Sequence, residues 1–224
     1  MSRSMSSAKS AAPSFVEMKA LLQKHQIALL SETYRDLTED SRWKRLSEFF
    51  LTDVYLVGDG SSRNESFMKL SRQFERLLDS SFRQGLGALI ELHQLSEKLD
   101  DKVSRMLMTM GVGYTLELAD YERAYRYVDN YDERIRQLDY IDQTLSFVHQ
   151  MASRRWMGFV IGTMQATARI AGVSAMVDFL DRGYSAFRSV PDITVFRTTI
   201  RSRELARLDR IYREIPMDSE RSTV

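Results

Sequence analysis

The chain lacks cysteine entirely, and this absence excludes disulfide bonds, thiolate nucleophiles and cysteine-ligated zinc or iron–sulfur sites. It also lacks an excess of one charge, because 32 Lys and Arg residues balance 31 Asp and Glu residues to a formal net charge of +1. Such a chain has no long-range field to attract nucleic acid or an anionic membrane, so we expect neither as a partner. The apolar fraction of 43% is too high for a disordered chain, and 224 residues suffice to bury a core.

Long apolar runs are missing as well. The longest stretch of low polarity, residues 157–180, is interrupted by a glutamine, an arginine and an aspartate, so it is too polar to span a bilayer. The first 13 residues are rich in Ser and Ala and lack the apolar core of a secretory signal, which favours a cytoplasmic protein. The predicted divisions are a disordered tail at 1–13, one helical domain at 14–216 and a second disordered tail at 217–224.

Proline is scarce, and none lies between Pro13 and Pro191. Long proline-free stretches with apolar residues at helical spacing, and no strand pattern, predict an all-α fold: a single compact bundle of about eight or nine helices. The predicted helices are 14–37, 42–55, 62–78, 87–110, one from 114, one from 130 to about 154, 156–171, 173–181 and 192–214. Capping boxes at Ser14–Glu17, Ser62–Glu65 and Asn130–Glu133 are expected to begin three of them. The expected breaks are at Gly58/Gly60, Gly85/Gly87, Gly111/Gly113, Gly172 and Gly183.

The sequence contains none of the motifs that would indicate a particular enzymatic reaction. It has no phosphate-binding loop, no dinucleotide fingerprint and no nucleophile elbow. Its three histidines, His25, His93 and His149, have no glutamate three residues before them, which excludes a di-iron bundle site. We therefore expect no metal site and no cofactor. Haem ligation by one histidine stays open, although the apolar stripe around His25 favours a core residue with its hydrogen bonds satisfied.

Charged residues fall on the predicted inner faces of two helices. The helix from residue 130 places them among Leu138 and Leu145, and the helix at 192–214 places them among Ile200 and Leu208. The candidate buried polar cluster comprises Arg134, Asp142, His149, Arg197, Arg201 and Glu204. Buried charges are costly unless paired, and the i,i+3 spacing of Arg201 and Glu204 would allow a direct pair. The cluster is either a structural network or a polar pocket for an anionic or hydrogen-bonding ligand, and the structural network is favoured.

Two further surfaces have competing interpretations. Six of the ten tyrosines lie between residues 114 and 140, which indicates either an aromatic wall for a ligand or, more simply, a core stripe. Four arginines on one side of the last helix (203, 207, 210 and 213) suggest a phosphate-binding strip, but interleaved acidic residues favour a solvated face. A homodimer is an open alternative, and its candidate residues are Met157, Phe159, Val160 and Met164.

The segment Phe49-Phe50-Leu51-Thr52-Asp53-Val54-Tyr55 resembles the FFLEELY-type motif of a family of uncharacterised all-helical bacterial proteins. Similar stretches are residues 95–100, 134–137 and 179–187, the last leading to Arg203-Glu204. The chain departs from the family where Leu56 follows Tyr55 and Asn64 follows Arg63. The resemblance implies a helical fold and brings no reaction or cofactor. The family-motif residues are Phe49, Phe50, Leu51, Asp53 and Tyr55, and the phenylalanines and Val54 are expected to anchor a core.

The sequence as a whole favours a helical binding or interaction protein of undetermined partner. The alternative is a small-molecule- or cofactor-binding enzyme with a polar site inside the bundle.

Overall fold

The structure, a computed structural model, describes residues 12–54, 80–159, 161–163 and 174–213. These residues form helices and contain no strand, which confirms the all-α prediction. The helix expected at 62–78, the breaks at Gly58/Gly60 and Gly172, and the motif residue Tyr55 lie outside the described residues. Within the described part of the chain, no helix is long and apolar enough to cross a membrane.

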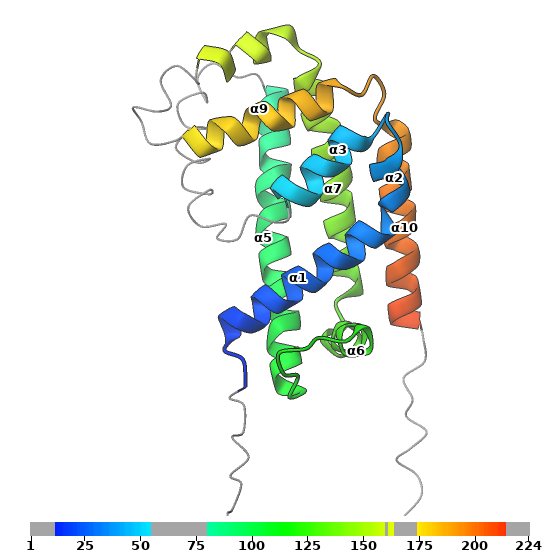
Figure 1. The fold of residues 1–224 in the computed structure, drawn as a ribbon. Helices are drawn as coiled ribbons and strands as arrows, with labels where there is room; N and C mark the ends of the chain where they lie inside the picture. Colours follow the sequence, from blue (N-terminus) through cyan, green and yellow to red (C-terminus); the bar gives the residue numbers. More distant parts are fainter. Residues whose placement is uncertain (1–11, 55–79, 160, 164–173, 214–224) are drawn as a thin grey trace, which may run out of the picture.

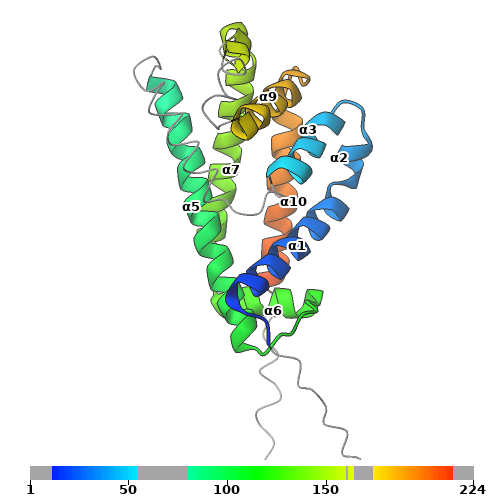
Figure 2. The ribbon, with the colours of Figure 1, turned by 60° about the vertical axis from the view of Figure 1, so that its left-hand side comes forward.

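Three long helices form the frame of the molecule: α5 (Ser80–Thr109), α7 (Tyr131–Ala152) and α10 (Thr194–Arg213). Helices α5 and α7 lie side by side, and α10 packs along the other side of α7 (Figure 1). Helix α1 (Phe15–Thr33) crosses this frame diagonally from α5 to α10 (Figure 2). These four helices therefore surround a common interior.

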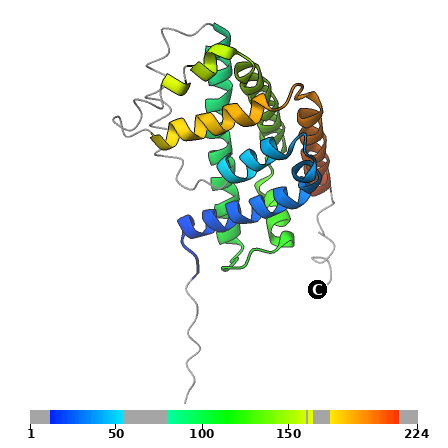
Figure 3. The same cartoon turned by 45° about the horizontal axis from the view of Figure 1, so that its top comes forward.

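Shorter helices close the two ends of the frame. Helix α6 (Leu118–Val128) lies across the end where α5 stops and α7 begins. Helix α9 (Ser174–Arg188) crosses the opposite end, beside α3 (Lys44–Phe49), as Figure 3 shows. The five-residue helix α2 (Arg35–Glu39) joins α1 to this region.

The chain begins α1 as the sequence predicts. The Ser14 backbone N–H donates to a Glu17 carboxylate oxygen at 2.8 Å, and the Glu17 N–H donates back to the Ser14 hydroxyl, so the predicted capping box is present. The helix ends at Thr33 instead of Leu37, because Tyr34 leaves helical geometry and α2 begins as a separate helix.

The capping box predicted at Ser62–Glu65 lies outside the described residues, and the one predicted at Asn130–Glu133 is absent. Asn130 precedes α7, but its side chain makes no cap hydrogen bond, and its Oδ1 accepts from the Tyr212 hydroxyl at 2.6 Å. Glu133 instead binds Lys98 and Lys102 of α5 at 2.6 and 2.5 Å. Both side chains are drawn away from the helix end by partners on other helices, which a local pattern does not reveal.

Several glycines expected to break helices lie inside them. Gly85 and Gly87 lie within α5, and Gly183 lies within α9. A Cβ at Gly85 would overlap the ring of Phe147, and a Cβ at Gly183 would lie 2.9 Å from Cζ of Phe49. These two glycines therefore allow helices to approach closely, and the prediction of breaks there is wrong. Gly111, which follows α5 with a φ of +73°, is a true helix terminator.

The core consists of two apolar clusters, one toward each end of the frame. The upper cluster joins α2, α3, α9 and α10 around Phe49, Phe187 and Phe196. The lower cluster joins α1, α5, α6, α7 and α10 around Leu22, Leu107 and Ile211. Helices α9 and α6, which contribute to the upper and the lower cluster respectively, lie at opposite ends of the ribbon (Figure 1). The polar residues considered next lie at and between these clusters.

Candidate functional site

Asp142 of α7 and Arg197 of α10 form the best-aligned pair of the predicted cluster. The Arg197 Nε and Nη2 atoms donate to the two carboxylate oxygens of Asp142 at 2.8 and 2.5 Å. This contact raises the pKa of the Arg197 guanidinium, mainly through the hydrogen bonds that it donates to Asp142. Both side chains are about a quarter to a third exposed. The pair therefore fastens α10 to α7 near the surface.

The sequence spacing suggests a direct pair between Arg201 and Glu204, but the structure does not contain it. The Arg201 Nη1 atom lies 2.7 Å from Asp139 on α7, and the Arg201 side chain is 43% exposed. Glu204 instead accepts from the Tyr34 hydroxyl at 2.6 Å. A cross-helix partner has thus replaced the local one for Arg201, whereas Glu204 also pairs with Arg207, the i+3 residue on its own helix, whose Nη1 lies 3.2 Å from a Glu204 carboxylate oxygen.

A shallow hollow lies between α7 and α10. Three of the predicted residues line it, together with four apolar side chains: Asp142, Arg197, Arg201, Leu138, Ile141, Leu145 and Ile200. It leaves no room for a water-sized molecule. Arg134, His149 and Glu204 do not line it. The predicted six residues are thus not one site, and this hollow is not a ligand pocket.

His149 lies apart from the other predicted residues. Its Nε2 atom is 2.9 Å from the Val190 carbonyl oxygen, close to the turn that connects α9 to α10. If the ring nitrogen carries the proton, this contact is a hydrogen bond that holds the turn against the end of α7. The partner is a backbone carbonyl, so the geometry gives His149 a positioning role.

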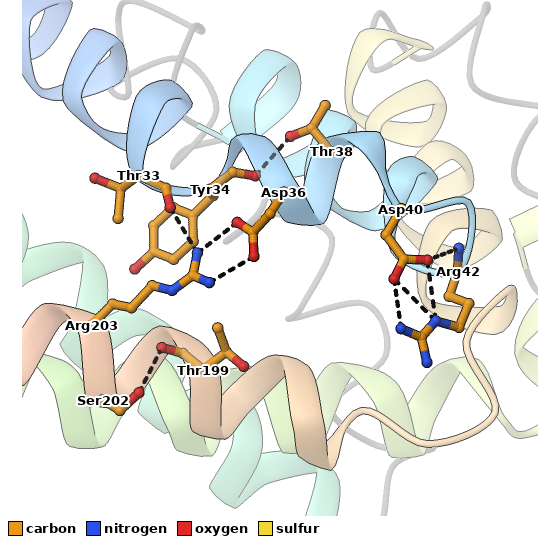
Figure 4. A network of polar contacts seen from close by, with 9 residues as sticks. All are labelled: Thr33, Tyr34, Asp36, Thr38, Asp40, Arg42, Thr199, Ser202 and Arg203. Carbon is orange, nitrogen blue, oxygen red and sulfur yellow. Dashed lines mark hydrogen bonds and ion pairs between the residues drawn. The ribbon is translucent and has the colours of Figure 1, made fainter.

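Other arginines of α10 also fasten helices together. Arg203 donates to both Asp36 carboxylate oxygens at 2.7 Å and to the Thr33 carbonyl oxygen at 2.7 Å, as Figure 4 shows. These hydrogen bonds hold the pKa of Asp36 below its usual value. Arg207 donates to the Thr33 hydroxyl at 2.7 Å, and its side chain is only 17% exposed. The expectation that this side of α10 is a solvated face is therefore wrong for Arg203 and Arg207.

Arg134 is the deeply buried member of the predicted cluster. It lies on α7 with 4% of its surface exposed. Its Nη1 atom donates to the side-chain oxygen of Gln137 at 3.1 Å, and Gln137 in turn donates to the Ser96 hydroxyl at 2.8 Å. The guanidinium carbon lies 4.3 Å from the centre of the Tyr125 ring, a cation–π contact. These contacts fix the plane of the guanidinium group.

Polar side chains from four other helices or their ends surround Arg134, and we call the whole group the Arg134 cluster. Its members are Gln26, Asp100, Tyr121, Tyr125, Asn130, Arg134, Gln137 and Tyr212. Gln26 donates to the Asp100 carboxylate at 3.1 Å. The Tyr121 and Tyr125 rings lie 4.5 Å apart. Both tyrosines are buried, which confirms the core-stripe interpretation for them, whereas Tyr114 is 48% exposed.

Burial shifts the ionisation of this cluster. It raises the pKa of Asp100, and hydrogen bonding from Gln26 and the Arg134 charge oppose the rise only partly. The pKa of Tyr212 rises to about 12, again mainly through burial. Burial alone would lower the pKa of Arg134, but the electrostatic effects of Tyr125, Tyr121 and Asp100 outweigh it and raise the value. Arg134 therefore keeps its charge inside the bundle.

The charge of Arg134 lacks part of its hydrogen bonding. Within the described residues, its Nε and Nη2 atoms are buried and have no hydrogen-bond partner, and no carboxylate lies within 4.0 Å. The Asn130 amide nitrogen and the His25 Nε2 atom are also buried without a partner. His25 contacts the Tyr121 ring at 5.1 Å, and burial lowers its pKa. The expectation that His25 has its hydrogen bonds satisfied is therefore wrong for Nε2.

The chemistry available to the Arg134 cluster is hydrogen bonding and charge neutralisation. Its unpartnered atoms include three N–H-bearing nitrogens, two of them on a permanent cation. Such a set recognises an acceptor, above all an oxyanion. No group of three His, Asp or Glu residues among the described residues could hold a metal ion.

The sequence placed Arg134 on an inner helix face but did not assemble its surroundings. Asp100, Gln26 and Tyr212 come from helices far apart in the chain, and no spacing rule links them. The one available signal was the tyrosine stripe, which does supply Tyr121 and Tyr125.

The family-motif residues lie in the upper core, away from Arg134. Phe49 ends α3, and Phe50 begins a π-helical turn, η1 (Phe50–Val54), which replaces the regular helix expected there. The Phe49 ring contacts Phe179 and Phe187 of α9 with centroid distances of 5.3 and 6.4 Å. The two phenylalanines therefore anchor a core, as predicted. Leu51 is partly exposed, and the side chain of Asp53 lies outside the described part of the structure.

Comparison with known families gives one match, which spans residues 6–217 and so nearly the whole chain. The protein belongs to the family described as a domain of unknown function, DUF8198. No match was found among curated proteins, and none among solved structures. Membership assigns no activity, so function has to be argued from the geometry.

Proposed function

We propose that this protein is a binding protein that takes up a small molecule inside its helical bundle, at the Arg134 cluster. One observation carries the proposal: a guanidinium group with 4% of its residue exposed has two nitrogen atoms without partners. Unsatisfied buried polar groups are rare in folded proteins and call for a specific explanation.

Energetics support a ligand as that explanation. Each buried unpartnered donor costs about 1–3 kcal/mol, and more for a charged group. The cation–π contact with Tyr125 contributes about 2 kcal/mol at most, and the hydrogen bond to Gln137 about 1–2 kcal/mol. These contributions leave the two free nitrogens uncompensated. A bound acceptor would supply the missing partners and convert a destabilising group into a recognition group.

Native mass spectrometry of the protein purified from its own host tests the proposal. We expect the wild-type protein to retain a small molecule above its mass of 26.0 kDa, and Arg134→Gln to lose it. Arg197→Gln is the matched control, because it removes an arginine already satisfied by Asp142. A wild-type protein that carries nothing, and whose thermal stability does not respond to host metabolite extract, contradicts the proposal.

Protein–protein interaction is a second candidate, because large apolar side chains are exposed at both ends of the frame. Phe159 is 75% exposed beside Trp156 at 41%, and Val16 is 75% exposed near Tyr114 at 48%. Exposed apolar patches mark interaction sites. Phe159 belongs to the proposed homodimer face, whose Val160 and Met164 lie outside the described side chains. Analytical ultracentrifugation of the wild type, Phe159→Asp and Val16→Asp tests it: a dimer lost in only one variant identifies the face, whereas a monomer at all concentrations refutes the homodimer.

The FFLEELY-like segment has a packing role in this proposal, since Phe49 fills the space left by Gly183. We also propose a bacterial origin and a cytoplasmic location, in keeping with that resemblance. Cell fractionation followed by immunodetection tests the location, and recovery outside the cytoplasmic fraction contradicts it.

A further inference from the structure

Two arginines of this protein hold a carboxylate through the Nε/Nη2 edge of the guanidinium group, whereas Arg203 holds Asp36 through Nη1 and Nη2. Arg197 grips Asp142 through Nε and Nη2, at 2.8 and 2.5 Å. Arg42 grips Asp40 through the same two atoms, at 3.1 and 2.6 Å. The two N–H groups on this edge are parallel and match the two oxygens of a carboxylate. In both cases the edge is filled by a side chain of the same protein.

The corresponding edge of Arg134 is buried and has no hydrogen-bond partner within the described residues. Its two unpartnered atoms are again Nε and Nη2, while Nη1 is engaged by Gln137. Because Gln137 and the Tyr125 ring fix the plane of the guanidinium group, this edge has a defined direction. Asp100, the nearest carboxylate in electrostatic terms, is held by Gln26 and does not come within 4.0 Å. Within the described residues no acceptor meets this edge, so a hydrogen-bond partner for it would have to come from outside the chain and displace the atoms that cover it.

We propose that the Nε/Nη2 edge of Arg134 binds the carboxylate of a small organic acid. This inference rests on the proposed function and names its ligand class. A monoanionic carboxylate neutralises the single charge of Arg134, whereas a phosphate dianion would place a second negative charge beside Asp100. The free amide nitrogen of Asn130, one helical turn before Arg134, offers a further donor to the same ligand.

The surroundings also restrict the remainder of the acid. The Tyr125 ring, which lies against Arg134, belongs to the lower core, and that core also contains the Tyr121 ring and the aliphatic side chains of Leu138 and Ile211. An apolar or singly hydroxylated tail suits these neighbours, and a second charged group does not. The Tyr125 ring covers the guanidinium face, so the ligand reaches its place only when neighbouring side chains move, and association is slower than diffusion.

The experiment compares carboxylates with close analogues that lack the matching charge or shape. Purified full-length protein is titrated with sodium acetate, propionate and butyrate, and separately with acetamide, sodium chloride and sodium phosphate, at constant ionic strength. Thermal unfolding and isothermal titration calorimetry are recorded. We expect a saturable rise in melting temperature with the carboxylates only, and the arginine Nε–H signal of Arg134 in NMR spectra should shift at saturation.

Two conservative variants separate recognition from general stability. Arg134→Lys keeps the charge but removes the parallel N–H edge, and we expect carboxylate affinity to fall at least tenfold. Arg197→Lys is the matched control and should leave the affinity unchanged. Equal stabilisation by acetamide or chloride, or an unchanged affinity in Arg134→Lys, overturns the inference. If Arg134→Lys does not fold, the acetate–acetamide comparison and the Nε–H signal of the wild type decide.

Failure of this inference is distinguishable from failure of the proposed function. A retained neutral molecule that depends on Arg134, together with no response to carboxylates, refutes the carboxylate but keeps the binding function. No retained molecule and no response to any probe refutes both.

Discussion

Gly85 and Gly87 lie two residues apart on α5 and offer a sharp test of how α5 packs against α7. A Cβ at Gly85 would overlap the Phe147 ring, whereas a Cβ at Gly87 would have no heavy atom within 4 Å. Glycine inside a helix is about 1 kcal/mol less favourable than alanine, so both substitutions gain equally from helix propensity. Any difference between Gly85→Ala and Gly87→Ala therefore measures the interhelical contact.

The expected magnitudes follow from these two effects. Gly87→Ala should stabilise the protein by about 1 kcal/mol. Gly85→Ala has the same gain but forces Phe147 or a helix to move, and such overpacking costs about 2–3 kcal/mol, so the net effect is a loss of about 1–2 kcal/mol. The two variants should then differ by about 2–3 kcal/mol, or roughly 5–10 °C in melting temperature for a chain of this size.

Urea denaturation followed by circular dichroism measures both free energies of unfolding. Measuring Gly85→Ala and Gly87→Ala again in a Phe147→Ala background completes a double-mutant cycle. Because the ring is absent there, Gly85→Ala should raise the free energy of unfolding as much as Gly87→Ala does. Equal stability of the two single variants, or a destabilising Gly85→Ala that persists in the Phe147→Ala background, would refute the close approach of α5 and α7.

Three further predictions concern a surface ion pair, a helix end and an interhelical pair. Two lysines lower the pKa of Glu133 to about 2, mainly through hydrogen bonds, so its stabilisation is complete above about pH 4.5 and is lost as the pH falls toward 2. In urea titrations, the free energy of unfolding of Glu133→Gln should thus be about 1 kcal/mol below that of the wild type at pH 7 and equal to it near pH 2. A difference between variant and wild type that does not change with pH contradicts this prediction. Gly111→Ala forces a residue with a side chain to a φ of +73° and should cost about 1–2 kcal/mol in melting experiments, while Gly113→Ala, whose φ is not positive, should not. Asp142→Asn leaves Arg197 without its counter-ion and should lower the free energy of unfolding by about 1–2 kcal/mol, and a neutral result would show that the pair is dispensable.

Local rules predicted those parts of the fold that local interactions decide. The Ser14–Glu17 capping box and the buried stripe containing Leu138 and Leu145 follow from spacing along one helix, and both are present. Spacing failed where another helix supplied a stronger partner. Gly183 lies inside a helix because Phe49 packs against it, and no one-dimensional pattern contains that contact.

The candidate site also combines a feature that local sequence predicts with contacts between helices that it does not. The position of Arg134 on an apolar helix face predicted its burial correctly. Its neighbours could not be predicted, because Gln26, Asp100 and Tyr212 are brought together only by the crossing of α1, α5 and α10. Arg201 was expected among buried side chains but extends to Asp139 at the surface, as its long aliphatic stem permits.

The partners of α10 are synthesised long before α10 itself. Asp36, Glu122 and Asp142 each accept hydrogen bonds from arginines of this helix. At about 5–20 residues per second, a ribosome needs roughly 4–14 s to proceed from residue 142 to residue 213. During that interval the growing chain carries its carboxylates unpaired and one side of α7 uncovered. The native bundle can therefore form only after α10 has been synthesised, and a ribosome stalled before α10 would present an incomplete bundle to chaperones and proteases.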